Sequence, residues 1–295
     1  MSIQALFSSA APVLSLAPMQ DVTDLPFWRL MARYGGADLY FTEFFRVTPH
    51  YSPEKSILRS ITENPTGRPA VAQIIGNDLE AMARTAKALE KHPVAAVDLN
   101  LGCPAPVVYR KCAGGGLLRD LPRVDELLGV LRAAITGSFT VKTRLGFSDP
   151  SEFDALLEVF SKHKLDLLTV HGRTVAEKYG PHVHLDCIAK AVRYLSFPVQ
   201  ANGNVTSAES AVETLRATGA AGLMIGRGAI PPQTGTDSHH QETSGKTQGR
   251  SSRCRCCTGR CTTNNCCRRE HGRPYRCQGS AESLWRGRRG CPDCH

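Results

Sequence analysis

Between residues 13 and 228 the chain alternates short apolar runs with longer amphipathic segments. The apolar runs are rich in aliphatic residues and lack polar alternation, which is typical of strands buried on both faces of a parallel sheet. We predict strands at 13–16, 37–43, 70–75, 95–100, 140–144, 165–171, 199–202 and 222–226. The amphipathic segments predict helices at 78–91, 123–136, 151–163 and 208–218, with N-caps at 77–78 and 206–207 and a C-terminal stop at Gly219.

Eight strands alternating with helices favour a closed (β/α)8 TIM barrel over an open doubly wound sheet. The position of polar residues supports the barrel, because they lie at or just after the ends of successive strands. They are Pro18, Met19, Gln73, Asn100, Lys142, His171, Asn202, Gly226 and Arg227. The carboxyl ends of barrel strands converge on one face, where barrel enzymes carry out their chemistry. We therefore expect an α/β barrel with its site on that face.

After Ile230 this pattern stops. Residues 231–295 contain no Val, Ile, Phe or Met, but they contain nine of the 12 cysteines. They also carry 12 Lys and Arg against five Asp and Glu, while residues 1–230 carry 24 against 22. Such a segment cannot bury enough apolar surface to offset its ordering entropy. We predict a barrel domain at 1–230 and a disordered Arg/Cys-rich tail at 231–295.

The segment 98–104, Asp-Leu-Asn-Leu-Gly-Cys-Pro, ends a buried strand with an amide and then places a thiol in a tight turn. Asn100 can present its amide to a planar heterocycle, and Gly102 lets the backbone approach a ligand. Most lone cysteines outside secreted proteins are small packing residues. The position of Cys103 at the predicted catalytic rim favours a chemical role instead.

Cationic side chains follow the next two strands. Lys142 and Arg144 alternate along one strand, so they project to the same side, where burial is costly unless an anion or an electron-rich ring meets them. His171 alone would suit a hydrogen-bonded core histidine. Beside Gly172 and Arg173 it better suits an anionic or flavin-like ligand.

Glycines follow the last two predicted strands, at Gly203, Gly226 and Gly228, with Arg227 between the latter two. In many barrels the loops after the seventh and eighth strands hold a phosphate through backbone N–H groups. Each segment alone is a weak motif. Together they predict a phosphate site.

The chain resembles the tRNA-dihydrouridine synthases through nine segments that occur in order. They are APMQDVTD, TEF, VAQIIG, DLNLGCP, GGGLLRD, VKTRLG, VHGRT, ANGNV and MIGRGA, and they lie between about Val13 and Ile230. The resemblance implies an FMN-containing barrel that uses NADPH to reduce particular uridines in tRNA to 5,6-dihydrouridine. In that reaction the reduced flavin gives hydride to carbon 6 of the uracil, and a cysteine protonates carbon 5.

The resemblance also implies roles for individual residues. Cys103 would be the acid, and a thiol is mostly protonated at neutral pH and can donate a proton. Asn100, Arg144 and Arg173 would lie near the uracil or its phosphates. No metal is expected. The residues implied for FMN binding are Pro18, Met19, Gln20, Gln73, Lys142, His171, Asn202, Gly203, Asn204, Gly226 and Arg227.

The tail departs from the family, whose members continue into a last barrel helix and a helical tRNA-binding domain. We interpret it as the product of a frameshift that replaces both. A zinc module is an alternative, because Cys254 and Cys257, and Cys291 and Cys294, form two C-x-x-C pairs, but more than 30 residues separate the pairs. A disordered basic arm that binds RNA is another.

Two functions compete with tRNA uridine reduction. One is a different FMN barrel oxidoreductase acting on free pyrimidines, and the other is a catalytically impaired RNA-binding remnant. No stretch of the sequence reaches the ~18 apolar residues of a membrane span, and the first residues lack the basic start of a signal peptide. We expect a cytoplasmic, monomeric protein without a membrane segment.

Overall fold

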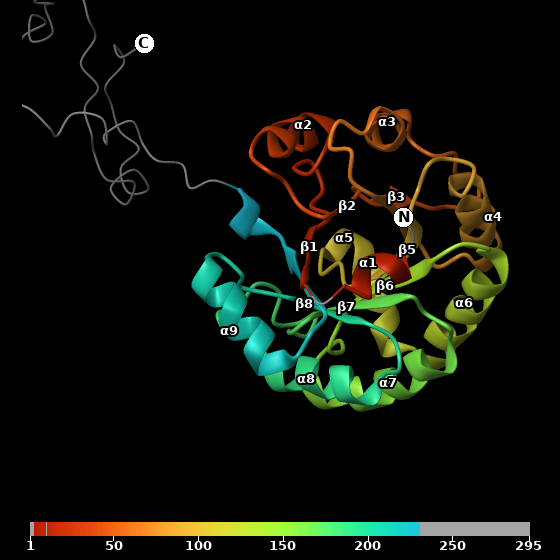
Figure 1. Cartoon of the computed structure of the whole chain (residues 1–295). Helices are drawn as coiled ribbons and strands as arrows, with labels where there is room; N and C mark the ends of the chain where they lie inside the picture. The colour runs from red at the N-terminus through yellow and green to blue at the C-terminus, as the bar shows by residue number, and fades with distance from the viewer. Residues whose placement is uncertain (1–2, 10, 231–295) are drawn as a thin grey trace, which may run out of the picture. The chain divides into compact units, whose positions relative to one another are not determined.

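The computed structural model describes residues 3–9 and 11–230, and these form a closed barrel of parallel strands surrounded by helices (Figure 1). In the described residues the ladder runs β2-β1-β9-β8-β7-β6-β5-β4-β3, and a further β2–β4 pairing closes the ring. The chain is a TIM barrel, as predicted. The strands are β1 (Val13–Leu16), β2 (Leu39–Phe41), β3 (Phe45–Arg46), β4 (Ala70–Ile75), β5 (Ala96–Leu101), β6 (Phe139–Arg144), β7 (Leu167–His171), β8 (Val199–Asn202) and β9 (Gly222–Ile225).

Nine strands fill eight places in the described ring because β2 and β3 are two pieces of one barrel strand. Tyr40 of β2 pairs with the start of β4, and Phe45 of β3 pairs with Ile74 near its end. Between the two pieces, the Thr42 hydroxyl accepts a hydrogen bond from the Gln73 backbone N–H at 3.2 Å, in place of a ladder carbonyl. The predicted strand at 37–43 is therefore shorter, and β3 is an addition to it.

The helices outside the barrel follow the predicted periodicity. Asp78 and Ser207 cap α4 and α9 through their side chains, and Gly219 ends α9 in the left-handed conformation, with φ of 66°. Those two caps and the stop are as the sequence predicts. The helices are α1 (Ile3–Phe7), α2 (Leu25–Arg33), α3 (Lys55–Glu63), α4 (Leu79–Leu89), α5 (Pro106–Tyr109), α6 (Leu121–Ala134), α7 (Phe153–Lys162), α8 (Leu185–Tyr194) and α9 (Ala208–Thr218), with 3-10 turns at Gly114–Arg119, Pro150–Glu152 and Arg227–Ala229.

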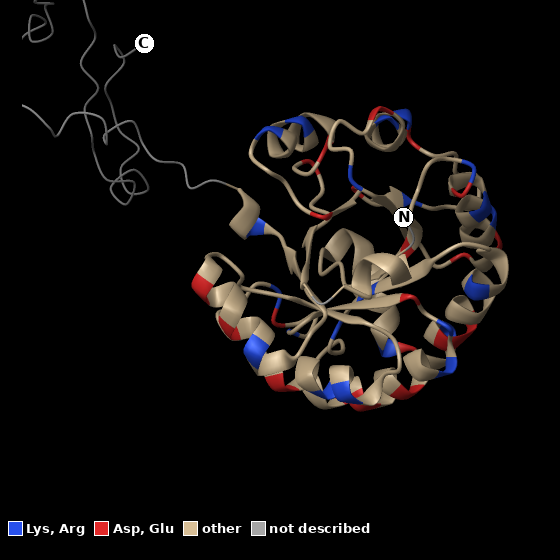
Figure 2. Ribbon diagram, viewed as in Figure 1, with Lys and Arg blue, Asp and Glu red and all other residues tan. Residues whose placement is uncertain are grey.

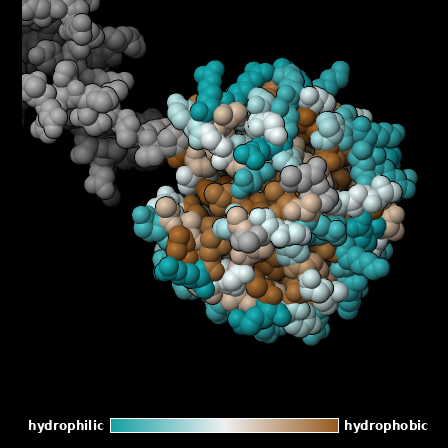
Figure 3. Space-filling view, in the orientation of Figure 1, coloured by the Kyte–Doolittle hydropathy of each residue, from teal (hydrophilic) through white to brown (hydrophobic). Residues whose placement is uncertain are grey.

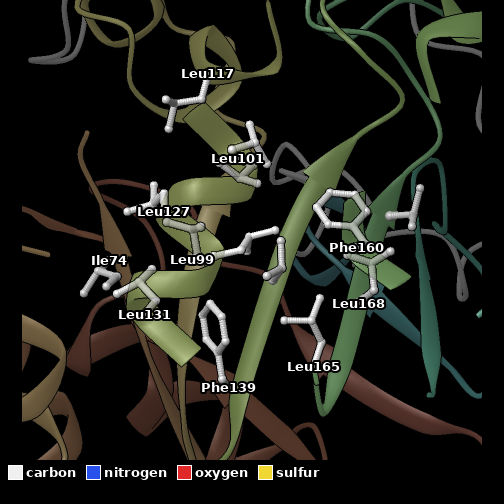
Figure 4. Packing of buried hydrophobic residues seen from close by; sticks show 14 of the residues in the cluster. Ile74, Leu99, Leu101, Leu117, Leu127, Leu131, Phe139, Phe160, Leu165 and Leu168 are labelled. Atoms are coloured by element: carbon white, nitrogen blue, oxygen red, sulfur yellow. The ribbon is translucent and has the colours of Figure 1, made fainter. Parts of the chain in front are cut away.

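Alternate residues of each strand face the helices or the barrel interior. Side chains such as Leu99, Phe139 and Leu168 pack outward against the helices in a continuous apolar layer (Figure 4). The interior carries a buried polar layer instead, formed by Ser15, Gln73, Asp98, Thr140, Thr169 and Gln200. Burying these polar groups is tolerable because hydrogen bonds satisfy them, as described below.

The amino-terminal end of the barrel is closed by α1. Ile3 and Phe7 are buried against residues at the starts of several strands, including Val13 and Leu39. Gln4 fixes the helix by donating a 2.9 Å hydrogen bond to Asp166, just before β7. Figure 1 shows α1 in front of the barrel centre. The interior is thus sealed at the end opposite the predicted site.

The ring of helices has a gap after β9, where the described chain forms only the 3-10 turn Arg227–Ala229 (Figure 1). Leu14 on the outer face of β1 is 36% exposed, and Val212 on α9 is 46% exposed. Charged residues follow the outer helices in Figure 2, whereas apolar surface is exposed beside α9 in Figure 3. Among the described residues, no α-helix follows β9, and apolar side chains of β1 and α9 are exposed there.

The predictions for residues 231–295, including the disordered tail, the zinc pairs and the frameshift, lie outside the described residues. The domain division at residue 230 stays a prediction for the same reason. None of the helices within the described ranges has the length and apolar character needed to cross a bilayer.

Candidate active site

A cavity with a volume of about 920 Å³ lies at the carboxyl ends of the strands. Loops after β1, β5, β7, β8 and β9 and the end of β6 contribute to its wall. Fourteen of the fifteen residues predicted for the site line it: Pro18, Met19, Gln20, Asn100, Cys103, Lys142, Arg144, His171, Arg173, Asn202, Gly203, Asn204, Gly226 and Arg227. The fourteen residues lie together around one cavity, as expected from their positions in the sequence, and their individual roles stay predictions.

Gln73 is the predicted site residue that does not line the cavity. It lies inside β4, two residues before the strand ends, and its amide is fully buried between Asp98 and Asn100. Lys142 also lies within its strand, two residues before the end of β6, but its side chain reaches the cavity. The expectation that these two residues lie at the ends of their strands is thus wrong by two residues. A short strand segment continues beyond each.

Cys103 reaches the cavity because the turn after β5 is tied to the strand. Asn100 Oδ1 accepts hydrogen bonds from the backbone N–H groups of Gly102, at 3.0 Å, and Cys103, at 2.9 Å. The Cys103 carbonyl accepts from Gly115 N–H at 3.2 Å. A Cβ on Gly115 would lie 3.0 Å from that carbonyl, so the glycine segment after α5 closes on the turn. The half-buried thiol is thereby held at the cavity wall.

The other described cysteines lie outside the cavity. Cys112 is exposed beyond α5, and Cys187 lies on α8. Burial and the carboxylate of Asp186 raise the pKa of the Cys187 thiol to about 11, which leaves it inert. Cys103 is therefore the described thiol with access to a ligand.

Lys142 is a cation held in a poorly solvated position. Burial, followed by the charge of Arg144, lowers the pKa of its ammonium to about 8, while Asp98 and Cys103 oppose this change. Asp98 lies deeper in the barrel, where burial raises the pKa of its carboxyl to about 6. Both groups are mainly charged at neutral pH. An ammonium in such a place favours an electron-rich or anionic ligand.

Arg144 is buried and holds two loops together. Its Nε donates to Gly102 O, and one terminal nitrogen donates to Thr174 O and Lys178 O, each at 2.8 Å. Burial lowers the pKa of the guanidinium to about 10, so it stays charged at neutral pH. Lys178 has φ of 50°, a left-handed conformation that is strained for lysine, and its carbonyl is one that Arg144 holds. Arg144 thus joins the turn after β5 to the loop after β7.

Arg173 and His171 form the opposite wall. A terminal nitrogen of Arg173 donates to His171 Nε2 at 3.0 Å, and the other donates to Asn204 Oδ1 at 2.8 Å. Burial and the charges of Arg144, Lys142, Arg173 and Arg227 lower the pKa of His171 well below its usual value. His171 is therefore neutral and accepts through Nε2. The buried Nε of Arg173 has no hydrogen-bond partner among the described residues.

The backbones of the loops after β8 and β9 can approach each other closely because glycine occupies the points of contact. A Cβ on Gly228 would lie 2.1 Å from the carbonyl oxygen of Val205, and Gly203 has φ of 133°. Arg227 is exposed beside these glycines, with its guanidinium 5.2 Å from the ring centre of Tyr179. The two glycine-bearing loops thus lie close together, and their role as a phosphate site stays a prediction.

The motifs around this cavity match one protein family over most of the chain. The model of the dihydrouridine synthase family, Dus, matches residues 15–262. The chain belongs to the dihydrouridine synthase family.

Named relatives agree with the family match. The chain is 37% identical over 217 residues to a tRNA-dihydrouridine synthase B of Pseudomonas putida, covering 73% of this chain and 64% of that protein. It is 34% identical over 225 residues to a tRNA-dihydrouridine(16) synthase of Ralstonia nicotianae, covering 74% and 69%. The alignment thus spans less than two thirds of the Pseudomonas protein. Among solved structures, a phosphoribosylanthranilate isomerase of Pyrococcus furiosus shows a TM-score of 0.44 at 13% identity, covering 74% of this chain and 89% of that one.

Several residues that line the cavity were not predicted from the sequence of this family member. Phe44 and Arg46 belong to the barrel strand formed by β2 and β3, and the break in that strand made its end unpredictable from the sequence. Tyr179, in the loop after β7, is 61% exposed, and its ring lies 5.8 Å from the Arg144 guanidinium and 5.2 Å from that of Arg227. An aromatic residue in an irregular loop carries no periodic signal. Its position five residues after the end of the segment VHGRT was the available clue.

Proposed function

We propose that this chain reduces uridine in tRNA to 5,6-dihydrouridine, with FMN as the bound cofactor and NADPH as the reductant. The observation that carries the proposal is the convergence of Cys103 with four cations, Lys142, Arg144, Arg173 and Arg227, around one cavity in a member of this family. Such a cavity suits an anionic cofactor and a polyanionic substrate. A tRNA substrate also implies a cytoplasmic protein.

The residues present fit FMN. The unpartnered Nε of buried Arg173 and the exposed guanidinium of Arg227 offer donors to a phosphate beside the glycine loops. Lys142 would lie against the electron-rich ring system, where an ammonium stabilises its anionic form. Pro18, Met19, Gln20, His171, Asn202 and Asn204 would complete the walls. When bound, the flavin supplies the hydride that adds to carbon 6 of the uracil.

The protein side of the reaction follows from the placement of Cys103. Adding hydride to carbon 6 leaves negative charge that must be quenched by a proton at carbon 5, and the half-buried Cys103 thiol faces the cavity and can donate that proton. His171 is a poor acid here, because its Nε2 accepts from Arg173 and its pKa is held well below the usual value, so the imidazolium form is not populated at neutral pH. The target base must leave its stack to enter, and exposed Tyr179 offers a surface against which it can stack.

The test compares the full chain with Cys103→Ala. We expect the variant to bind flavin and to accept electrons from NADPH, but to form dihydrouridine about 10²- to 10⁴-fold more slowly, the usual contribution of a positioned acid. Cys112→Ala, which removes an exposed thiol, is the matched control. Dihydrouridine in tRNA is measured by nucleoside mass spectrometry.

Two other results would reject the proposed activity, and a third would reject the role of Cys103 alone. Reduction of free uracil or another pyrimidine in preference to tRNA would indicate the alternative oxidoreductase. Binding of tRNA without flavin would indicate an impaired RNA-binding remnant. Normal product formation by Cys103→Ala would remove Cys103 from the acid role.

A further inference from the structure

A series of hydrogen bonds connects a carboxylate inside the barrel with the backbone of Cys103. Asp98 Oδ2 accepts from Gln73 Nε2 at 2.8 Å, and Gln73 Oε1 accepts from Asn100 Nδ2 at 2.8 Å. Asn100 Oδ1 then accepts from the N–H groups of Gly102 and Cys103. Asp98 and Gln73 are fully buried, and Asn100 is nearly so. We call the side chains of Asp98, Gln73 and Asn100, together with these two N–H groups, the Asp98 relay.

The two ends of the Asp98 relay fix its direction. An ionised carboxylate accepts hydrogen bonds and donates none, while a backbone N–H donates and never accepts. The side-chain amides of Gln73 and Asn100 each have one accepting and one donating end, so both must be oriented as observed. Either amide turned around would place two donors or two acceptors face to face in a buried site, which is costly.

We propose that Asp98 is the positioning residue for Cys103, acting through Gln73 and Asn100. Its negative charge sets the orientation of both amides, so that the Asn100 carbonyl faces the two N–H groups of the turn and holds the thiol at the cavity wall. The interpretation of Cys103 as a proton donor rests on the proposed function. The geometry of the Asp98 relay does not.

The environment of Asp98 leaves its carboxyl ionised at neutral pH, but with a pKa only slightly below neutral. Burial raises the pKa of the carboxyl to about 6, and the hydrogen bonds from Thr140 and Gln73 and the charge of Lys142 oppose the rise. Thr140, on β6, donates to the other carboxyl oxygen at 2.6 Å. Lys142, also on β6, is the charged group facing Asp98. A protonated carboxyl can donate as well as accept, so acid removes the directional constraint.

The first measurement uses the wild-type chain without tRNA. Hydrogen–deuterium exchange of the Gly102 and Cys103 amides is followed across about pH 5–7, around the Asp98 pKa, and corrected for intrinsic exchange. We expect protection to fall by about tenfold on the acid side, as for the loss of one hydrogen bond. Alkylation of Cys103, read from its own peptide by mass spectrometry, should change over the same range.

Two matched variants assign the transition to Asp98. Thr140→Val removes a donor to the carboxylate, so it should move the midpoint to higher pH. Thr169→Val removes an equally buried hydroxyl from the next strand, where Thr169 donates to Gln200 at 3.3 Å, and should leave the midpoint unchanged. A third variant, Asp98→Asn, should abolish the pH dependence.

The outcomes separate this proposal from the proposed function. The positioning role would be overturned if exchange and alkylation in the wild type showed no pH midpoint. It would also be overturned if Thr169→Val moved the midpoint as far as Thr140→Val does. Neither readout needs product formation. A protein that passes these tests but makes no dihydrouridine would reject the proposed function alone.

Discussion

At the residue scale, the site consists of charges that the barrel holds away from water. Lys142 and Asp98 lie on neighbouring strands, with Asn100 directly paired to Lys142 in the ladder. Burial shifts the pKa of the carboxyl upward and that of the ammonium downward, so each is nearer to losing its charge than it would be in water. Retaining both charges is costly, and groups kept charged at such cost are candidates for function.

Lys142 provides a test of this view. On the proposed function, Lys142→Ala should bind FMN less tightly, or its flavin should be reduced more slowly by NADPH, because the variant lacks an ammonium to stabilise the electron-rich ring. Since the Lys142 pKa is lowered to about 8, the same loss should appear in the wild type as pH rises through about 8. Arginine keeps its charge at that pH, so Lys142→Arg should lack this alkaline limb.

The measurements for Lys142 are flavin content and the stopped-flow rate of flavin reduction. Lys87→Ala, at an exposed position on α4, is the control. Equal flavin content and equal reduction rates in wild type and Lys142→Ala would exclude Lys142 from the cofactor site.

At the element scale, the loops rather than the strands carry the precision of the site. Arg144 starts from β6 and reaches the turn after β5 and the loop after β7, so three consecutive barrel units are joined by one guanidinium. Five fixed donors suit this task, whereas a lysine ammonium cannot reach three separated carbonyls in the same geometry. The predicted substrate-binding role of Arg144 is therefore accompanied by a structural one.

Arg144→Lys should lower the free energy of unfolding by about 2–4 kcal/mol, because buried carbonyls lose charge-assisted partners. The loop at 174–180 should also become more sensitive to limited proteolysis. Urea unfolding and protease mapping measure the two effects. Arg59→Lys alters an exposed pair with Glu63, which solvent screens, and should leave the unfolding curve almost unchanged. Equal unfolding curves for both variants would contradict the bridging role.

The elements were largely predictable because each carries its own local pattern. The buried runs of β1, β4 and β8 begin and end at the predicted residues, and α9 does too. The break between β2 and β3 was not predictable, because it depends on Thr42 meeting Gln73 from the next strand. The orientation of Gln73 was missed for a related reason. Its partners, Asp98 and Asn100, lie about 25 residues away and reveal themselves only in the folded barrel.

At the scale of the whole molecule, the buried polar layer makes the stability of the fold depend on pH. The Asp98 pKa is higher in the folded protein than its usual value of 3.8, so the folded state binds the proton more tightly than the unfolded state. The stability that this carboxyl contributes is complete below about pH 4 and is lost as pH rises through about 6.

Asp98→Asn cannot titrate, so its stability relative to wild type should increase from pH 4 to pH 8, by up to about 3 kcal/mol. Melting temperatures measured at several pH values test this, with Asp186→Asn, an exposed carboxylate on α8, as the control. A relative stability that stays constant or falls with rising pH would show that Asp98 costs the fold nothing. If Asp98→Asn is more stable but its Cys103 turn is less protected from exchange, the buried carboxylate lowers the stability of the fold while holding the Cys103 thiol in position.

The helix α1 that seals the amino-terminal end has a kinetic consequence. With Ile3 and Phe7 packed into that end of the barrel, the described interior opens at the carboxyl face, where Cys103 also lies. On the proposed function, the nicotinamide of NADPH and the target uridine must reach the flavin through one mouth, and the space that one occupies is denied to the other. Initial rates measured against both substrates should therefore give parallel double-reciprocal lines, the pattern of a ping-pong reaction, with each substrate inhibiting competitively at high concentration. Intersecting lines would mean that the two substrates are bound together.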